Sequence, residues 1–255
     1  MWFCRYALNT EGNDYFTTDN HGCWRELLAF LKSVNFNPEK DRLFHGGDMI
    51  DRGPDSTEVL RWLAKPWFYP IMANHELTAI GISRGYHQHA TFIKNGGQWF
   101  LNLPQALQIE FASAFMTLPL GMQVETPFGA IGIVHAESLP SWKDTAAQLE
   151  GFAQLSKTKR DDLVSIITRS RTRWEDKIAT DITGIDRVYV GHSPYLEPVR
   201  FGNVFNFDTG VVYGNKLTIV NMTKDTLHYV PAEKVYWESS DPNHTPAANY
   251  ERFIR

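Results

Sequence analysis

The segment LFHGGDMIDRG, residues 43–53, decides the fold class. A short apolar run opens it and stops at two glycines and Asp48. Similar runs lead into Asp19 and His21, into Asn74 and His75, into His135 and into His192. Loops at the carboxyl ends of strands in an α/β sheet converge on one crevice, so polar residues scattered along the chain can meet there. The sequence therefore predicts one polar site at strand ends.

Helical patterns alternate with these apolar runs. Short, largely buried strands are predicted at 15–18, 43–47, 67–73, 130–134, 187–191, 204–207 and 216–221. Helices are predicted at 23–34, 55–64, 105–116 and 157–168, the first from the apolar stripe of Leu27, Leu28, Leu31 and Val34. This alternation predicts a layered α/β fold.

Composition narrows the class of protein. The 255 residues, 43% of them hydrophobic, fit one domain over residues 1–255. A formal net charge of −4 provides no basic field, so neither nucleic acid nor a membrane surface is expected as a partner. We expect a soluble, unprocessed, cytoplasmic protein, because no signal peptide or membrane span is visible and the only cysteines are Cys4 and Cys23, although one disulfide stays open.

The polar residues at the strand ends are typical of a metal site. Two carboxylates, one amide and at least three imidazoles, without a thiolate, favour manganese, iron or zinc over calcium or a closed cysteine-type zinc site. The set is too large for one ion. A carboxylate that bridges two cations roughly 3.5–4 Å apart would let them clamp a phosphoryl group and activate a water. Asp48 is the candidate bridge.

The ordered motifs resemble those of a known family. They are DNHG at 19–22, GDMIDRG at 47–53, NHE at 74–76, His135 and GH at 191–192. In this order they resemble the signature of the phosphoprotein phosphatases, a group of calcineurin-like metallophosphoesterases, and most strongly that of the small bacterial and bacteriophage serine/threonine phosphatases. NGGQWF at 95–100 and DTGVVYGNKLTIV at 208–220 extend the likeness over nearly the whole chain. The resemblance implies a calcineurin-like fold, an α/β layered β-sandwich flanked by helices.

The resemblance also implies roles for individual residues. Asp19 and His21 would bind the first of two divalent ions, Asn74, His135 and His192 the second, and Asp48 both; manganese is the expected metal, with iron or zinc as alternatives. His75 would be the general acid, oriented by Asp51. Expulsion of an alkoxide requires a proton, which an imidazole kept charged by a carboxylate can supply.

Basic and amide side chains are expected to bind the phosphate. Arg52 and Arg169 would contact its nonbridging oxygens through fork-shaped donor pairs, beside Asn74 and His75. The segment RSRTRW also offers Arg171 and Arg173, which could equally form a solvated loop with Glu175 and Asp176.

Two motifs depart from the family pattern. Thr18 and Ala73 stand where relatives have glycine, and Asn20 stands where they have an apolar residue. The added Cβ atoms are expected to shift the backbone and weaken metal binding, chiefly at Asp19 and His21.

The remaining histidines and aromatics are predicted to be structural. His45, His87, His89, His228 and His244 match no motif and are expected to face solvent or to form structural hydrogen bonds. Strand alternation places His45 opposite Phe44 and away from the site. Trp99 and Phe100 are expected in the core, and 137–159 as a packed helix rather than a flap.

Three functions follow in order of preference. The first is hydrolysis of phosphoserine, phosphothreonine and also phosphotyrosine in proteins or peptides, or of phosphorylated small molecules. The second is symmetrical dinucleoside tetraphosphate hydrolysis, suggested by PEKDRL at 38–43 and GPDSTEVLRWL at 53–63; such enzymes usually have ARG at 51–53 and NHD at 74–76. The third is a noncatalytic phosphate-binding scaffold.

Overall fold

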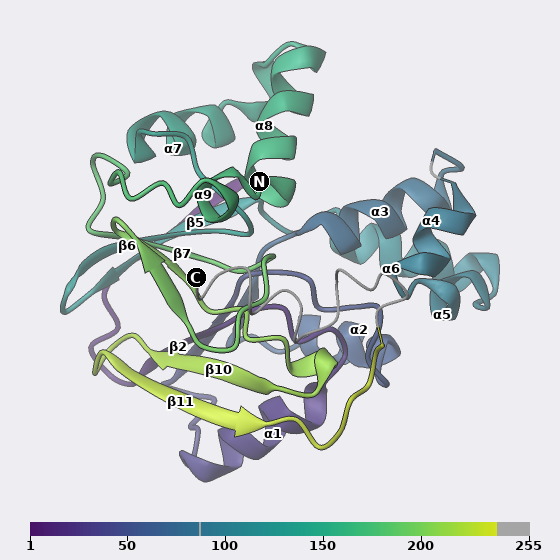
Figure 1. Cartoon of the computed structure of the whole chain (residues 1–255), viewed down its shortest axis with the longest axis horizontal. Helices are drawn as coiled ribbons and strands as arrows, with labels where there is room; N and C mark the ends of the chain where they lie inside the picture. Colours follow the sequence, from purple (N-terminus) through teal and green to yellow (C-terminus); the bar gives the residue numbers. More distant parts are fainter. Residues whose placement is uncertain (87, 239–255) are drawn as a thin grey trace.

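The computed structural model describes residues 1–86 and 88–238, which contain two β-sheets with helices around them (Figure 1). One sheet has five strands in the order β11-β10-β2-β3-β4. These are β2 (Asp14–Thr17), β3 (Arg42–His45), β4 (Phe68–Pro70), β10 (Lys216–Asn221) and β11 (Thr226–Pro231). The central strands β2, β3 and β4 run parallel, so their carboxyl ends lie at the same edge of the sheet.

The other sheet has six strands in the order β1-β5-β6-β7-β9-β8. These are β1 (Phe3–Tyr6), β5 (Gly121–Thr126), β6 (Gly129–Val134), β7 (Arg187–Val190), β8 (Val199–Phe201) and β9 (Val204–Asn206). Strand β7 is parallel to both of its neighbours, β6 and β9, which again brings their carboxyl ends to one edge.

The core between the sheets follows from side-chain alternation along the strands. Phe16 and Phe44 on one sheet pack in a single buried cluster with Met122, Ile133 and Tyr189 on the other. Tyr15 and Leu43, one position away, point to the opposite face of their sheet and join the larger cluster formed with the helices. The sheets therefore form a sandwich.

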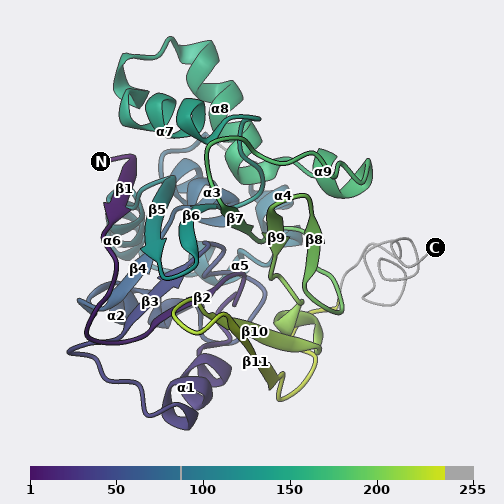
Figure 2. The same ribbon diagram turned by 90° about the vertical axis from the view of Figure 1, so that its left-hand side faces the viewer.

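Helices cover both outer faces (Figure 2). On the five-stranded sheet lie α1 (Trp24–Ser33), the 3₁₀ turn η1 (Ser56–Glu58) and α2 (Val59–Leu63), joined by a stack of Trp24 on Trp62 with ring centroids 4.7 Å apart. On the six-stranded sheet lie α7 (Trp142–Glu150), η2 (Phe152–Gln154), α8 (Lys157–Arg169) and α9 (Thr172–Glu175). Ser141 and Ser156 cap α7 and α8, since each side-chain oxygen accepts an amide N–H of the first turn.

A separate layer of helices follows β4. It comprises α3 (Asn74–Ser83), α4 (His89–Lys94), α5 (Gln98–Leu101) and α6 (Gln105–Phe115), to the right in Figure 1. The 3₁₀ turn η3 (Val211–Tyr213) precedes β10. Within the described part of the chain no helix is both long and apolar enough to cross a membrane.

The predicted layered sandwich is confirmed, and each predicted strand and helix has its counterpart, although 55–64 begins as a 3₁₀ turn. The segment 137–159 does contain a packed helix, α7, with Trp142 and Leu149 buried. Strands β1, β5, β8 and β11 and helices α3, α4, α5 and α9 were not predicted. Helix α3 escaped prediction because its apolar residues do not fall into one stripe.

Candidate metal centre

The predicted ligands all follow strands whose carboxyl ends face one another. Asp19 and His21 follow β2, Asp48 follows β3, Asn74 opens α3 after β4, His135 follows β6 and His192 follows β7. The first four come from the five-stranded sheet and the last two from the six-stranded one. The site therefore lies where the two sheets meet.

Strained backbone concentrates at this site. Among residues 1–86 and 88–238, nine non-glycine residues have positive φ, and six of them are Asp19, His21, Asp48, Asp51, Arg52 and His192. Left-handed conformations are unfavourable for residues with a Cβ atom, and they persist where the surrounding structure imposes them. Such clustering is typical of functional loops.

One group of ligand atoms is compact. His135 Nε2 lies 3.3 Å from Asp48 Oδ2, 3.0 Å from Asn74 Oδ1 and 3.2 Å from His192 Nδ1. The other ring nitrogen, His135 Nδ1, donates to the Gly46 carbonyl at 2.8 Å, which leaves a lone pair on Nε2 in the neutral ring. Acceptor atoms thus face one another, an arrangement that a shared cation satisfies.

The electrostatics of this group also favour positive charge. Burial alone would lower the pKa of His135, but Asp48 and Asp19 outweigh it and raise that pKa to about 9. Burial would raise the pKa of Asp48, yet His135 and His75 hold it well below its usual range. Burial and the Arg171 guanidinium lower the pKa of His192, which keeps this imidazole neutral, as a metal ligand must be.

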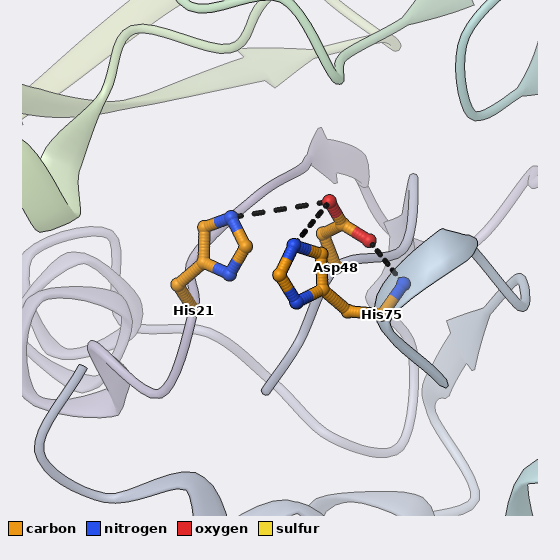
Figure 3. Close-up of side chains that lie close together, drawn as sticks. All are labelled: His21, Asp48 and His75. Atoms are coloured by element: carbon orange, nitrogen blue, oxygen red, sulfur yellow. Dashed lines mark hydrogen bonds and ion pairs between the residues drawn. The ribbon is translucent and has the colours of Figure 1, made fainter. Parts of the chain in front are cut away.

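A second group shares Asp48. His21 Nε2 lies 3.9 Å and His75 Nε2 3.8 Å from Asp48 Oδ2, and the two rings face this one oxygen (Figure 3). His21 Nδ1 donates to the Ile50 carbonyl at 2.8 Å, so its Nε2 also offers a lone pair. That lone pair accepts a hydrogen bond from Arg52 Nη1 at 2.8 Å. Asp48 therefore belongs to two groups of possible ligands, as a bridging carboxylate would.

Asp19 lies beside these groups rather than within either of them. Its two carboxylate oxygens accept the His192 amide N–H at 3.0 and 3.1 Å, and Thr18 Oγ1 donates to one of them at 2.5 Å. Burial, and then the nearby carboxylate of Asp208, raises the pKa of Asp19 well above its usual value. His75 takes the place in the cluster that was predicted for Asp19.

His75 and Asp51 form a close pair. His75 Nδ1 lies 2.5 Å from Asp51 Oδ2, and Asp51 is fully buried. The other oxygen of Asp51 accepts the indole N–H of Trp99 at 2.6 Å. A carboxylate paired with Nδ1 fixes the ring and leaves Nε2 facing Asp48.

Glu76 joins the loop after β3 to the start of α3. Its buried carboxylate accepts the amide N–H groups of Asp48, Met49 and Ala73 at 2.8–3.2 Å. Burial and the neighbouring Asp48 carboxylate raise the pKa of Glu76 to about 7. These three hydrogen bonds fix the orientation of Asp48 relative to Asn74.

Glycines accommodate the two departures at Thr18 and Ala73. A Cβ on Gly46 would lie 2.6 Å from Thr18 Oγ1, and one on Gly191 2.5 Å from the same atom. A Cβ on Gly47 would lie 2.4 Å from that of Ala73, whose own φ of −119° is ordinary extended backbone. The extra methyl and hydroxyl groups therefore fill space that neighbouring glycines leave.

The three candidate arginines occupy different environments. Arg169 Nη2 reaches Thr78 Oγ1 at 3.5 Å; burial lowers the pKa of Arg169, and Asp48 partly offsets that effect. Arg171 Nη2 donates to the His192 carbonyl at 3.1 Å, which brings it closer to the ligands than the sequence indicated.

Arg173 has a structural role. It is buried, and its Nε donates to Glu137 at 2.8 Å, so the alternative of a solvated loop with Glu175 and Asp176 does not hold for this residue. Its Nη1 donates to the carbonyls of Ile178 and Thr180 and thereby holds the loop after α9.

Of the residues predicted to be structural, His45 and Phe100 are buried in such a role, whereas Trp99 also contacts the site. His45 is buried against Trp24 and Phe68, opposite Phe44, and accepts the Gly47 N–H, as predicted. Phe100 is buried, as predicted. Trp99 packs on Phe100 but also contacts the site through Asp51. The hydrogen bond from Trp99 was not foreseen.

Two of the other unassigned histidines, His89 and His228, lie in the described part of the chain. His89 starts α4, and His228 packs on Phe30. His87 and His244 lie outside the described residues. Asp208 is buried and lies close to Arg52 and Asp19. The motif that contains it, DTG at 208–210, is part of the family resemblance, but Asp208 was not predicted as a site residue.

The chain is similar to known proteins both in sequence and in structure. The sequence model described as calcineurin-like phosphoesterase matches residues 15–196. Serine/threonine-protein phosphatase 1 of Salmonella typhimurium is 31% identical over 80% of this chain and 89% of its own. The symmetrical bis(5'-nucleosyl)-tetraphosphatase of Methylobacillus flagellatus is 27% identical over 85% and 94%. A protein serine/threonine phosphatase from Saccharomyces cerevisiae shares the fold, with a TM-score of 0.58 at 16% identity over 95% of this chain and 86% of that one.

Proposed function

The chain belongs to the calcineurin-like phosphoesterase family, and from this premise we propose that it removes phosphate from serine and threonine side chains of proteins or peptides. As a member of this family it is a metal-dependent phosphoesterase. The observation that carries the finer proposal is the pair formed by His75 and Asp51 at 2.5 Å, next to Asp48. Tyrosine phosphate and small phosphomonoesters are further substrates that this chemistry admits.

The donor atoms around Asp48 fit two cations. Asp48, His135, His192 and Asn74 would hold one, and Asp48 with His21 the other; Asp19, which lies beside these groups, is the further ligand proposed for that cation. Bound there, two divalent ions would polarise the phosphoryl oxygens and lower the pKa of an attacking water. Oxygen and imidazole donors without thiolate suit manganese, iron or zinc, and manganese is the metal that we propose from the likeness to the phosphoprotein phosphatases.

His75 is proposed as the proton donor to the leaving oxygen. Serine and threonine alkoxides are strong bases, so their departure from phosphorus requires a proton at the moment of bond cleavage. Asp51 stabilises the charged imidazole at Nδ1 and leaves Nε2 free to deliver that proton.

Arginines are proposed to bind the phosphate group. Arg52 lies beside His21, with its guanidinium over the Tyr213 ring at 5.7 Å, and Arg169 lies within the electrostatic reach of Asp48. Arg171, next to His192, joins them as a third candidate. Such forked donors neutralise oxygens that two metals would leave exposed.

Symmetrical dinucleoside tetraphosphate hydrolysis is the second candidate, and the similarity to the Methylobacillus flagellatus enzyme supports it. A nucleotide phosphate is a much better leaving group than an alkoxide and has less need of a proton donor. The buried pair of Asp51 and His75, together with Glu76 in place of aspartate, therefore favours the phosphatase. The same pair argues against a binding scaffold, which requires no proton donor.

The test is a substrate panel on purified protein. The protein, stripped of metal, should be inactive on p-nitrophenyl phosphate and regain activity with manganese. Turnover of a phosphoserine peptide should then exceed that of diadenosine tetraphosphate. The reverse preference would transfer the assignment to the second candidate, and inactivity with every divalent metal at several pH values would remove both.

A further inference from the structure

Trp99 has a contact that its expected place in the core does not explain. Its indole Nε1 donates to Asp51 Oδ1 at 2.6 Å, while Asp51 Oδ2 accepts His75 Nδ1 at 2.5 Å. Each oxygen of this fully buried carboxylate thus has one donor of its own. We propose that Trp99 is a positioning residue for the general acid, because its N–H fixes the carboxylate that orients His75. This inference rests on the proposed function.

The segment that carries Trp99 is packed directly on the loop of Asp51. Gly96 has a φ of +93°, and a Cβ there would lie 2.4 Å from the Arg52 amide nitrogen. The Gly96 carbonyl accepts that amide N–H at 3.5 Å. The close approach leaves little freedom for Asp51 to move relative to Trp99.

The indole ring is itself fixed by aromatic neighbours. Phe100 and Phe111 meet it edge to face, with ring centroids 5.5 and 5.3 Å away. Helix α6 supplies Phe111, so the hydrogen bond of Trp99 connects the aromatic packing of α5 and α6 to the site. A buried indole N–H generally finds an acceptor, and here the acceptor is the carboxylate that also pairs with His75.

Loss of the indole N–H would leave Asp51 Oδ1 buried without a donor. A buried carboxylate oxygen in that state turns toward another donor or admits water, and either change moves Oδ2 relative to His75. Residues that orient a catalytic group through a second residue usually contribute about one to two orders of magnitude to the rate. The effect should appear where proton delivery limits the rate.

The experiment compares two aryl phosphates that differ in leaving-group basicity. In Trp99→Phe, kcat on phenyl phosphate should fall about tenfold, with KM within about twofold of wild type. Turnover of 2,4-dinitrophenyl phosphate, whose leaving group needs no proton, should change less than about twofold. Thermal unfolding of the variant checks that the fold persists.

The chain offers a matched control. The buried indole of Trp142 on α7 also donates one hydrogen bond, to Gln123 Oε1 at 3.0 Å, on the six-stranded sheet. Trp142→Phe removes the same chemical group and should leave the ratio of the two rates unchanged. In an Asp51→Asn background, Trp99→Phe should alter that ratio by less than about twofold, because the two residues act through one path.

The outcomes distinguish the positioning role of Trp99 from the proposed phosphatase activity. Equal losses on both esters, or a change in KM alone, would overturn the positioning role while leaving the phosphatase assignment intact. A wild-type protein without turnover of either ester in the presence of manganese would overturn the proposed function and this role together.

Discussion

The two groups of ligands that share Asp48 are built differently. Around His135, acceptor atoms of Asp48, Asn74 and His192 lie within 3.3 Å. Around His21, the distances to Asp48 Oδ2 approach 4 Å, and an arginine already contacts the imidazole lone pair.

The difference shows how a protein can prepare one metal position more fully than its neighbour. A backbone carbonyl fixes the imidazole of His135 and that of His21 alike, but only the compact group combines residues from both sheets. The looser group lies in strained loops of one sheet, beside Asn20, whose buried amide has no partner. We therefore expect the compact position to bind metal more tightly.

Removal of the shared carboxylate should eliminate this contrast altogether. In Asp48→Asn both positions lose their common ligand, so metal content and turnover should fall together, with kcat reduced about 10³-fold or more. Elemental analysis and p-nitrophenyl phosphate kinetics measure the two effects. Asp225→Asn, at a remote surface pair with Arg187, is the control. Retention of two ions per chain would exclude Asp48 as the bridge.

Arg52 offers a way to change one position alone. In Arg52→Met the His21 lone pair loses its donor, so the looser position should bind manganese about tenfold more tightly, because a competing cation is gone. Turnover should fall at least about tenfold, since the phosphate loses a forked donor. Calorimetric metal titration and steady-state kinetics should thus move in opposite directions. Weaker metal binding in this variant would show that Arg52 supports the site rather than competing for it.

Asn20 tests whether a buried amide without hydrogen-bond partners, next to the looser position, destabilises the fold. Its side-chain oxygen and nitrogen are buried without partners, whereas those of Asn206 are both hydrogen-bonded. Asn20→Leu keeps the branched shape and should raise the unfolding free energy by about 1–2 kcal/mol. Asn206→Leu, the matched control, should lower it by a similar amount. Thermal shift measures both, and a lower melting temperature for Asn20→Leu would contradict the account.

The smallest expected effect is on the pH dependence of stability, and it comes from Asp208, a buried neighbour of Asp19. Burial raises the pKa of Asp208 from 3.8 to about 6, so the folded chain holds this proton more tightly than the unfolded chain. The resulting stabilisation is present at low pH and is lost as the pH rises through about 6. From pH 5 to pH 7 the free energy of unfolding of the metal-free wild type should therefore fall by about 1 kcal/mol more than that of Asp208→Asn, as measured by urea unfolding. Parallel pH profiles would rule this out.

Much of the architecture could be predicted because it depends on local pattern. Apolar runs that stop at Asp48, His135 or His192 identify buried strands and the edge at which they end. Helix α3 could not be predicted in this way, because its apolar residues form no single stripe and its first turn is tied to the loop of Asp48 through Glu76, a contact between distant segments.

The missed contacts are those that tertiary packing creates. Trp99 and Asp51 are 48 residues apart, and Arg173 and Glu137 are 36 apart, with nothing in either segment to indicate its partner. Side chains of this kind could each satisfy their polar atoms with water in an unfolded chain. Such a side chain needs a particular protein partner only once it is buried, so the spacing of residues in the sequence does not indicate which partner that is.

The origin of the ligands in two different sheets has a thermodynamic consequence. A cation held by Asp48 and Asn74 on one side and by His135 and His192 on the other would act as a cross-link between the layers of the sandwich. Because such a cation would bind only the folded chain, its binding would stabilise that state. At a free metal concentration one hundred times the dissociation constant, about 2.7 kcal/mol would be added to the free energy of unfolding. The supply of metal would set how firmly the two layers stay together.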